Sequence, residues 1–367
     1  MRAIVVSHLY ADAATRGKLR ALAGLGCTIG AVAPASWQPA PGVASQATEF
    51  GNDGAVRIFP VTVRGAAPDL AWESAALKRA LAEFRPDVVQ VEEPASSAVA
   101  AAVLRAAGRL HFKVVIFSSD SLPSPLPFLG RVRRDRVLNR AAGAIGGNRL
   151  ALALLSQGRS LQTMILPQTG VTPPLVAEPP VRPGLAIGFI GRLVPERGLD
   201  LLFRAAVRLS DSWTLHVAGT GPAQEELESL AEKLGIAARV TWHGALSRTA
   251  LGALWPKLDC VALPSRTTPR WVESRGRTAL EAMAHGLAVV VTASGALPEV
   301  VGAAGRVVPE EGVDQLSEAL QEFARDVEGR RALGADARRR VLAEYTDAAV
   351  AERTLAFWRL VTTSASP

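Results

Sequence analysis

Residues 271–290 read WVESRGRTALEAMAHGLAVV and carry two glutamates ahead of a strand-like run. Glu273 and Glu281 are separated by seven residues. The apolar residues after Gly276 recur at near-helical spacing, and Gly286 stands where a helix should stop. The β-branched run that follows is typical of a buried strand. We therefore expect a loop that carries Glu273, a helix with Glu281 in its first turn, and a parallel strand.

Two carboxylates at the entrance of a helix have two interpretations. In an open parallel sheet, loops that enter helix N-termini line the ligand crevice and present backbone N–H groups to it. One carboxylate there can accept hydrogen bonds from the hydroxyls of a ribose, while the other reaches a sugar ring beyond a diphosphate. Alternatively, Thr278 to Glu281 forms a capping box, which needs no ligand. This stretch alone leaves both interpretations open.

The stretch and its flanks resemble the Glu-x7-Glu signature of retaining family-4 glycosyltransferases of the GT-B fold. The similar segments are PSRTTPRWVES at 264–274, GRTALEAMAHG at 276–286 and SGALPEVVG at 294–302. The resemblance implies that Glu273 contacts the donor sugar in catalysis and that Glu281 binds the ribose. Ser274 and Arg275 depart from the family pattern, in which a small or amide residue and Phe are usual. We expect the loop still to turn at Gly276, and Arg275 to alter donor choice.

A second motif supplies cations. Residues 185–198, LAIGFIGRLVPERG, read as a strand followed by a loop. They resemble the family's Gly-Arg and Lys-Gly motif, whose two cations hold the donor diphosphate, with Arg197 in place of Lys. Two arginines beside a helix start are more often surface residues, but a guanidinium can bind phosphate bidentately. With the glutamate pair nearby, we expect a donor site. Its expected residues are Gly191, Arg192, Arg197, Ser265, Gly276, Arg277, Thr278 and Glu281.

Strand and helix patterns alternate through both halves of the chain. Strand-like runs, among them 113–118, alternate with Ala-rich helical stretches, among them one near 74–84, through the first 166 residues. A second alternation begins at residue 185, with strands expected at 185–190 and 260–263. Residues 167–184 hold six prolines without an apolar period, which indicates a linker. The pattern predicts an α/β protein with doubly wound sheets. With the resemblance, we expect a GT-B fold of two Rossmann-like parallel-sheet domains that face an interdomain cleft.

The expected domains differ in their roles. Residues 1–168 form the acceptor-binding domain, 169–184 the linker, and 185–345 the domain that binds the nucleotide sugar. A last helix at about 346–363 is expected to pack back on the first domain, as is usual for GT-B chains. Phe357, Trp358 and Leu360 are its expected anchors.

Polar residues cluster at predicted strand ends of the first domain and should face a cleft. These residues are His8, Tyr10, Arg16, Gly17, Glu92, Glu93, Ser118, Ser119 and Asp120. The family often has a Gly pair after the first strand and a His or acidic residue after a central one. Here Arg16 and Gly17 replace that pair. Asp120 and Glu93 are candidates to accept the acceptor's proton, although the more usual role of either residue type at such a position is to cap a turn. We name Asp120 as a catalytic candidate, and His8, Arg16, Gly17 and Glu93 as acceptor-side candidates.

Composition restricts the class of protein. The chain is 49% hydrophobic and 20% charged, which is typical of folded globular domains. Cys27 and Cys260 lie far apart in apolar runs, which argues against a disulfide framework and against a metal site. We expect a reducing cytoplasm. The start lacks the features of a secretion signal, and no apolar run reaches the ~18–20 residues of a spanning helix. Any membrane contact is therefore expected to be peripheral.

The charge is concentrated in the first half. Residues 1–170 hold 19 basic and 11 acidic residues, a balance of +8, whereas the whole chain carries +7. The densest basic run, at 131–140, places Arg133, Arg136 and Arg140 on one helical stripe. Such a run is usually a solvated helix face. The alternative is attraction to an anionic lipid surface or an anionic acceptor. Nucleic acid is less favoured, since no recognition motif accompanies the charge.

The sequence and the resemblance together predict a retaining glycosyltransferase. It should move a sugar from a nucleotide-diphosphate donor, such as a UDP-sugar, to a glycan, a lipid-linked or a small-molecule acceptor. We expect no cofactor and no metal, because Arg192, Arg197 and helix N-termini can meet the leaving charge. Two alternatives remain: a GT-B sugar-nucleotide epimerase or phosphorylase, and a sugar-nucleotide-binding protein without turnover.

Overall fold

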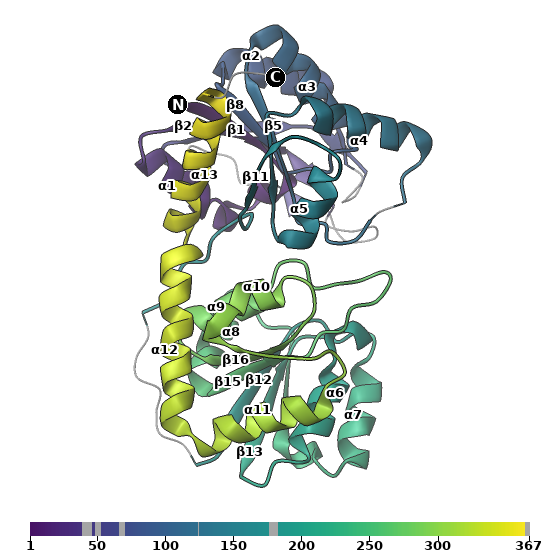
Figure 1. Cartoon of the computed structure of the whole chain (residues 1–367), viewed down its shortest axis with the longest axis vertical. Coiled ribbons are helices and arrows are strands. Elements are labelled where there is room, and N and C mark those ends of the chain that lie inside the picture. Colours follow the sequence, from purple (N-terminus) through teal and green to yellow (C-terminus); the bar gives the residue numbers. More distant parts are fainter. Residues whose placement is uncertain (39–45, 48–52, 66–69, 124, 176–182, 364–367) are drawn as a thin grey trace. The chain divides into compact units, whose positions relative to one another are not determined.

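The computed structural model of the chain describes residues 1–38, 46–47, 53–65, 70–123, 125–175 and 183–363 (Figure 1). The chain divides into two compact units. The first consists of Met1–Gly170 together with Asp347–Pro367, and the second of Val171–Thr346. Each unit contains a parallel sheet with helices packed against it. The first passage of the chain between the units, after Gly170, falls within the proline-rich segment, and the second follows Thr346.

The first unit contains a doubly wound sheet in the strand order β11-β10-β9-β8-β1-β2-β5. Its strands are β1 (Arg2–Val6), β2 (Thr28–Pro34), β5 (Val56–Val61), β8 (Val88–Val91), β9 (Lys113–Ser118), β10 (Gly143–Gly146) and β11 (Gln162–Ile165). Small pairs are formed by β3 (Ser36–Trp37) with β4 (Gln46–Ala47) and by β6 (Val63–Arg64) with β7 (Ala71–Trp72). The strand order reverses between β1 and β8, and such a reversal is where ligands bind in open α/β sheets.

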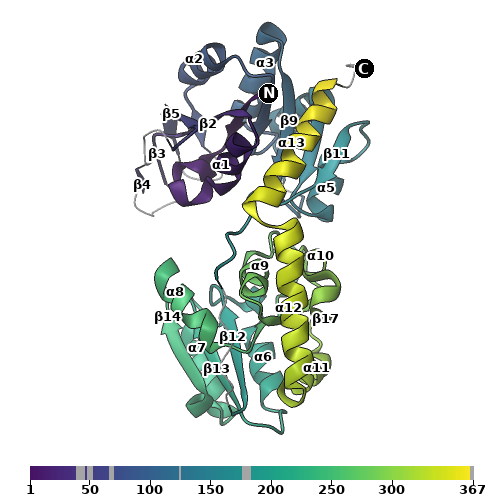
Figure 2. The same cartoon turned by 90° about the vertical axis from the view of Figure 1, so that its left-hand side faces the viewer.

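Helices cover both faces of this sheet. They are α1 (Gly17–Gly24), α2 (Ser74–Phe84), α3 (Ala98–Leu110), α4 (Phe128–Arg140), α5 (Arg149–Ser156) and α13 (Asp347–Thr363). Phe84 and Val103 pack with Val89 in one core, and Leu22 and Trp358 pack with Val5 in the other. Figure 2 shows α1 and α13 side by side. Because both faces are buried, the strands are apolar almost without interruption.

The second unit repeats this design. Its sheet has the strand order β14-β13-β12-β15-β16-β17, and the order reverses between β12 and β15. The strands are β12 (Leu185–Ile190), β13 (Trp213–Ala218), β14 (Val240–Gly244), β15 (Cys260–Leu263), β16 (Ala288–Thr292) and β17 (Arg306–Val308). The helices are α6 (Leu199–Ala206), α7 (Gln224–Lys233), α8 (Arg248–Leu254), α9 (Arg277–Ala284), α10 (Leu297–Val301), α11 (Val313–Arg325) and α12 (Val327–Glu344). Two doubly wound parallel sheets confirm the predicted α/β class.

The last helix, α13, completes the first unit, and one of its expected anchors is wrong. Phe357 and Trp358 are buried, and the Trp358 indole N–H donates to Gln90 Oε1 at 2.9 Å. Leu360 is 46% exposed. Each residue turns a helix by about 100°, so Leu360 points roughly 200° away from Trp358. Within the described residues, no helix is long and apolar enough to cross a membrane.

Candidate functional site

The switch point of the second unit brings together two loops that the sequence analysis selected. The loop after β12 contains Gly191, Arg192 and a short 3-10 helix, Pro195–Arg197. The loop after β15 contains Glu273 and ends at Gly276, the N-cap of α9. The carboxyl ends of adjacent parallel strands share one edge of the sheet, so both loops lie at the position where such sheets bind ligands.

Arg197 and Glu273 form an ion pair at this edge through Arg197 Nη1 and Glu273 Oε2. The two side chains are 25% and 10% exposed, so the pair is largely removed from solvent. The Arg197 guanidinium also lies over the Trp271 ring, 5.2 Å from its centre. An arginine has five N–H donors. Because the pair with Glu273 involves only Nη1, this guanidinium retains donors for an anionic ligand.

The other carboxylate oxygen of Glu273 fixes the loop. Oε1 accepts the backbone N–H groups of Gly276 at 3.1 Å and of Arg275 at 3.3 Å. Gly276 has a φ of +59°, in the left-handed region that favours glycine. One side chain therefore joins the turn before α9 to the cation of the neighbouring loop.

Gly198 permits the close approach of these loops. Its φ is +69°, and a Cβ at this position would overlap the Pro264 carbonyl oxygen, in the loop after β15. Gly191 lies beside Arg197, since a Cβ there would be 3.8 Å from Arg197 Nε. The absence of a side chain at Gly198 thus lets the two loops pack directly against each other.

Glu281 does not lie in the first turn of its helix, so that expectation is wrong. Helix α9 begins at Arg277, and the Arg277 Nε donates to Glu281 Oε1 at 2.8 Å, one turn further along. The capping-box interpretation is wrong as well. Thr278 lies inside the helix, and the N-cap is Gly276, which has no side chain to cap with. The loop turns at Gly276 as expected, and this left-handed turn sets the helix start at Arg277.

The remaining donor-side candidates differ in their surroundings. Arg192 is exposed and has no ion-pair partner among the residues that the structure describes. Ser265 is buried, and its carbonyl oxygen accepts from Thr292 Oγ1 at 2.5 Å. Direct contacts, or the continuous loop and helix at 273–281, thus link five of the candidates: Arg197, Glu273, Gly276, Arg277 and Glu281. Arg192 lies on the same loop as Arg197.

Arg266 holds the loop after β15 in place, and the sequence analysis did not select it. Its Nη1 and Nη2 donate to the two carboxylate oxygens of Asp200, at 2.6 and 2.7 Å, and its Nε pairs with Glu311 at 2.5 Å. These hydrogen bonds, those to Asp200 first, raise the pKa of Arg266 above its ordinary value. Asp200 lies in the first turn of α6, so Arg266 ties this loop to the helix that follows Arg197.

The switch point of the first unit holds His8 and Glu93. Glu93 Oε1 accepts from the His8 backbone N–H at 2.8 Å and lies 2.7 Å from His8 Nδ1. Glu93 is buried, whereas His8 is partly exposed. The Trp37 ring lies 5.0 Å from the His8 ring, centre to centre. A carboxylate oxygen at Nδ1 favours the tautomer that carries its proton there, which leaves Nε2 as the acceptor.

Beside this pair, Glu92 is the centre of a buried polar network. Its carboxylate accepts from Lys18 Nζ at 2.8 Å, from Gln90 at 2.7 Å, from Gln168 at 3.0 Å and from the Tyr10 hydroxyl at 3.2 Å. Burial and the Glu92 charge raise the pKa of Tyr10 well above its ordinary value. Lys18 is nearly fully buried. A buried charge requires such partners, so Tyr10 and Glu92 support the fold instead of facing an open cleft as expected.

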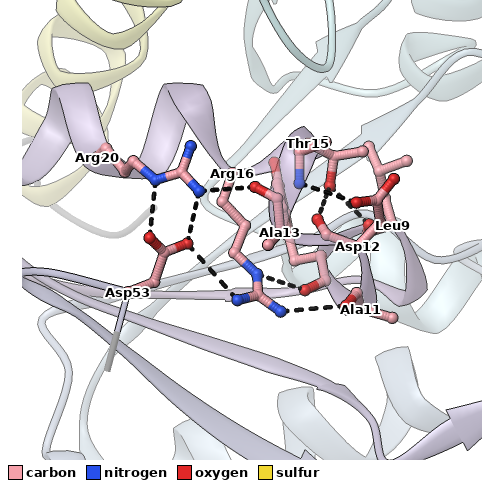
Figure 3. A network of polar contacts seen from close by, with 10 residues as sticks. Leu9, Ala11, Asp12, Ala13, Thr15, Arg16, Arg20 and Asp53 are labelled. Carbon is pink, nitrogen blue, oxygen red and sulfur yellow. Dashed lines mark hydrogen bonds and ion pairs between the residues drawn. The ribbon is translucent and has the colours of Figure 1, made fainter. Parts of the chain in front are cut away.

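Arg16 and Gly17 are engaged within the first unit. Arg16 is 2% exposed and donates to the carbonyl oxygens of Tyr10 at 2.8 Å and Ala11 at 3.1 Å (Figure 3). A Cβ at Gly17 would overlap the Asp347 carboxylate, at the start of α13. Arg16 therefore fixes the turn before α1, and Gly17 leaves room for Asp347 beside the start of α1.

Asp120 is exposed, and its backbone N–H donates to Ser118 Oγ at 3.0 Å. Among the described residues, the structure shows no hydrogen bond or ion pair that links Asp120 to His8 or Glu93. Asp120 thus lies on the chain after β9, whereas the His8 and Glu93 pair lies where β1 and β8 end.

Asp53→Asn is expected to lower the stability of the first unit by about 1 kcal/mol at neutral pH. Asp53 accepts two hydrogen bonds from Arg20, at 2.8 and 2.9 Å, and lies 3.5 Å from Arg16 (Figure 3). The hydrogen bonds from Arg20 hold the pKa of Asp53 below its ordinary value. This stabilisation is present above the unfolded-state pKa of about 3.9 and is lost as the pH falls through the folded-state pKa. Urea unfolding of both proteins from pH 7 to pH 3 should show their difference shrinking, and a constant difference would contradict the assignment.

Residues 182–340 match the family described as "Glycosyl transferases group 1". The donor-side loops lie within this segment. The match covers less than half of the chain, so it shows what this segment is similar to. The "GDP-mannose-dependent alpha-(1-6)-phosphatidylinositol monomannoside mannosyltransferase" of Mycobacterium tuberculosis (strain CDC 1551 / Oshkosh) is 36% identical over 163 residues, 42% of either chain. The "D-inositol 3-phosphate glycosyltransferase" of Mycobacterium ulcerans (strain Agy99) is 38% identical over 151 residues, 39% of this chain and 31% of that protein. The chain thus spans less than half the length of these relatives.

Solved structures resemble the chain over nearly its whole length. Sucrose-phosphate synthase from Thermosynechococcus elongatus matches all of both chains with a TM-score of 0.73 and 18% identity. Anabaena Alr3699/HepE in complex with UDP matches 98% of this chain and 99% of its own, with a TM-score of 0.71 and 17% identity. These likenesses confirm the predicted GT-B fold class. The expected cleft between the two domains stays a prediction.

Proposed function

We propose that the chain transfers a sugar from a nucleotide-diphosphate donor to an acceptor hydroxyl, with retention of the anomeric configuration and without a metal. The observation that carries this proposal is the Arg197 and Glu273 ion pair at the switch point of the group 1 segment. It joins a cation suited to a diphosphate with a carboxylate suited to sugar hydroxyls. The resemblance of the flanking sequence to a retaining family supports the proposed stereochemistry.

The leaving group is a nucleoside diphosphate, whose negative charge grows as the bond to the sugar breaks. Donors fixed in advance toward such a charge lower the barrier, since they need no reorganisation during the reaction. Arg197 is held in place by Glu273 and Trp271, and Arg192 adds an exposed guanidinium on the same loop. These two cations support metal-independent transfer. In our proposal the departing phosphate then takes the acceptor proton on the same face of the sugar.

On the acceptor side, we propose that His8 positions the acceptor hydroxyl. Glu93 orients the imidazole so that Nε2 can accept a hydrogen bond from that hydroxyl, and the Trp37 ring beside it offers an apolar surface for a ring-shaped acceptor. Asp120, exposed after β9, is the alternative to the departing phosphate as the group that takes the acceptor proton. The two relatives are named for inositol-containing acceptors, so such compounds are the first to try.

The donor is tested by thermal shift followed by product analysis. GDP, UDP and ADP, with GDP-mannose and UDP-glucose, should include a ligand that raises the melting temperature, because a ligand bound only to the folded state stabilises it. Proton NMR of the product formed with a panel of inositol and sugar acceptors would then read the anomeric configuration, with and without EDTA. An inverted product would contradict retention, and loss of transfer in EDTA would contradict metal independence. Conversion of the donor alone to an epimer would instead identify an epimerase.

Arg192→Ala is expected to weaken nucleoside diphosphate binding roughly tenfold to a hundredfold, the effect of a lost charge-assisted hydrogen bond. Isothermal titration calorimetry with the diphosphate found by thermal shift measures it. Arg204→Ala is the matched control, because Arg204 is also exposed and lies on α6 in the same unit. Equal affinities of the wild type and Arg192→Ala would remove Arg192 from the site.

Glu281→Ala is expected to lower kcat/KM for the donor, with a loss of transition-state stabilisation of roughly 2–4 kcal/mol, the scale of a lost polar substrate contact. In our proposal the Glu281 carboxylate turns from Arg277 to the ribose hydroxyls. Glu318→Ala, on the exposed face of α11, removes a carboxylate from the same unit as a control. Steady-state kinetics with varied donor measure both proteins. Full activity of the Glu281 variant would contradict a ribose contact.

A further inference from the structure

Helix α4 has an exposed face that combines apolar and cationic side chains. Phe128 and Leu129, at its first turn, are 69% and 73% exposed, and Val132 is 40% exposed. Val137 and Leu138 are buried on the opposite side. On a helix of about 3.6 residues per turn, positions 128, 132, 136 and 140 share one side, with 129 and 133 beside them. The helix lies alongside α3 in its unit (Figure 1).

The helix is also strongly basic. Helix α4 contains five arginines, at 131, 133, 134, 136 and 140, and a single acidic residue, Asp135. Asp135 is paired with Arg134 at 3.0 Å and with Arg159 at 2.6 Å, so other arginines balance its charge. Arg131, Arg136 and Arg140 are exposed and, within the described part of the chain, have no carboxylate partner. Along this face, Arg136 and Arg140 follow the apolar residues, whereas Arg131 lies in the first turn on the flank above Leu138.

We propose that α4 docks the chain on an anionic lipid surface. Phe128 and Leu129 would enter the boundary between headgroups and acyl chains, while Arg131, Arg136 and Arg140 bind lipid phosphates. A lipid bilayer presents anionic groups directly beside an apolar layer, which matches the order of side chains along this face. The excess of +8 over residues 1–170 strengthens the attraction. A nucleic acid would leave Phe128 and Leu129 in water.

Vesicle co-sedimentation of the full chain tests this proposal. Vesicles of phosphatidylcholine with 30% phosphatidylglycerol should bind the protein in 0.1 M NaCl, and vesicles of phosphatidylcholine alone should not. Binding should fall in 0.5 M NaCl, because salt screens exposed charges. The triple variant Arg131→Gln, Arg136→Gln, Arg140→Gln should bind at least tenfold more weakly, since each basic residue near an anionic surface contributes roughly fivefold. The double variant Phe128→Ser, Leu129→Ser should bind at least tenfold more weakly as well.

A matched triple variant tests whether vesicle binding depends on this face of α4 or only on the net charge of the chain. Arg204→Gln, Lys233→Gln, Arg248→Gln removes the same charge from exposed positions of the other unit and should leave vesicle binding within about twofold. Circular dichroism melting of each variant checks that it is folded, and surface substitutions should change stability little. Absence of binding to anionic vesicles would overturn the proposal, as would equal losses in both triple variants. Binding to heparin without binding to vesicles would also overturn it. None of these outcomes depends on sugar transfer.

Discussion

Glu273→Gln should lower kcat for sugar transfer by about a hundredfold to a thousandfold, the effect of removing one positioned group from a preorganised site. The substitution removes charge with little change of shape. An amide oxygen can still accept the N–H groups of Arg275 and Gly276 that Oε1 accepts now. The amide nitrogen, however, would face Arg197, which donates to Oε2 in the wild type. The loop should keep its turn while the ion pair is lost.

The measurement is steady-state sugar transfer with varied donor, which separates an effect on kcat from an effect on KM. Glu322→Gln is the control, because Glu322 forms an exposed ion pair with Arg306 in the same unit. It should keep wild-type turnover. A Glu273 variant with unchanged kcat would contradict a catalytic role, and a loss confined to KM would assign Glu273 to donor binding alone.

Trp358→Ala should lower the stability of the first unit by about 3–5 kcal/mol, the range for a large aromatic side chain removed from a core. Trp358 is fully buried in the cluster that contains Leu22 and Val5. Its indole N–H donates to Gln90 Oε1, and Gln90 in turn donates to Glu92. The variant therefore leaves a cavity and an unsatisfied polar group beside a buried ion pair, and both are costly.

Amide hydrogen exchange in β1 and β8 measures this loss within the first unit, so the second unit does not contribute to it. Leu360→Ala is the matched control, since Leu360 lies on the same helix and is half-exposed. It should change stability by less than about 0.5 kcal/mol. Similar effects of the two substitutions would contradict the assignment of Trp358 as the anchor of α13.

Burial on both faces made several elements predictable from sequence. Strands β9, β12 and β15 have the predicted bounds, 113–118, 185–190 and 260–263. Each is an apolar run between polar or glycine-containing loops, and such runs form the central strands of doubly wound sheets. Helix α2 also has its predicted bounds, 74–84, because its apolar residues recur at helical spacing.

Contacts between distant residues were not predictable from local patterns. Lys18 and Glu92 are 74 positions apart, and Arg266 and Asp200 are 66 positions apart. A periodicity shows which face of an element is buried but not which charge lies opposite it. Arg16 is a case in point, because only the fold shows that it binds backbone carbonyl groups.

At the candidate site, the sequence selected both members of the Arg197 and Glu273 pair but not the Trp271 ring beneath the guanidinium. A single aromatic residue in a loop carries no periodic signal. The helix start was also misplaced, because the prediction put Glu281 in the first turn, whereas a left-handed residue at 276 ends the loop and α9 begins at Arg277. Motif spacing thus identified the charged pair, and the left-handed backbone at Gly276 determined where the helix that carries Glu281 begins.

The first unit is assembled from both ends of the polypeptide, with Met1–Gly170 joined by Asp347–Pro367. During translation, the second unit is therefore complete before the ribosome has made the helix that buries Trp358 against the first. Domains tend to fold as units while they are synthesised. We expect nascent chains that end before residue 347 to contain a protease-resistant second unit and a protease-sensitive first one.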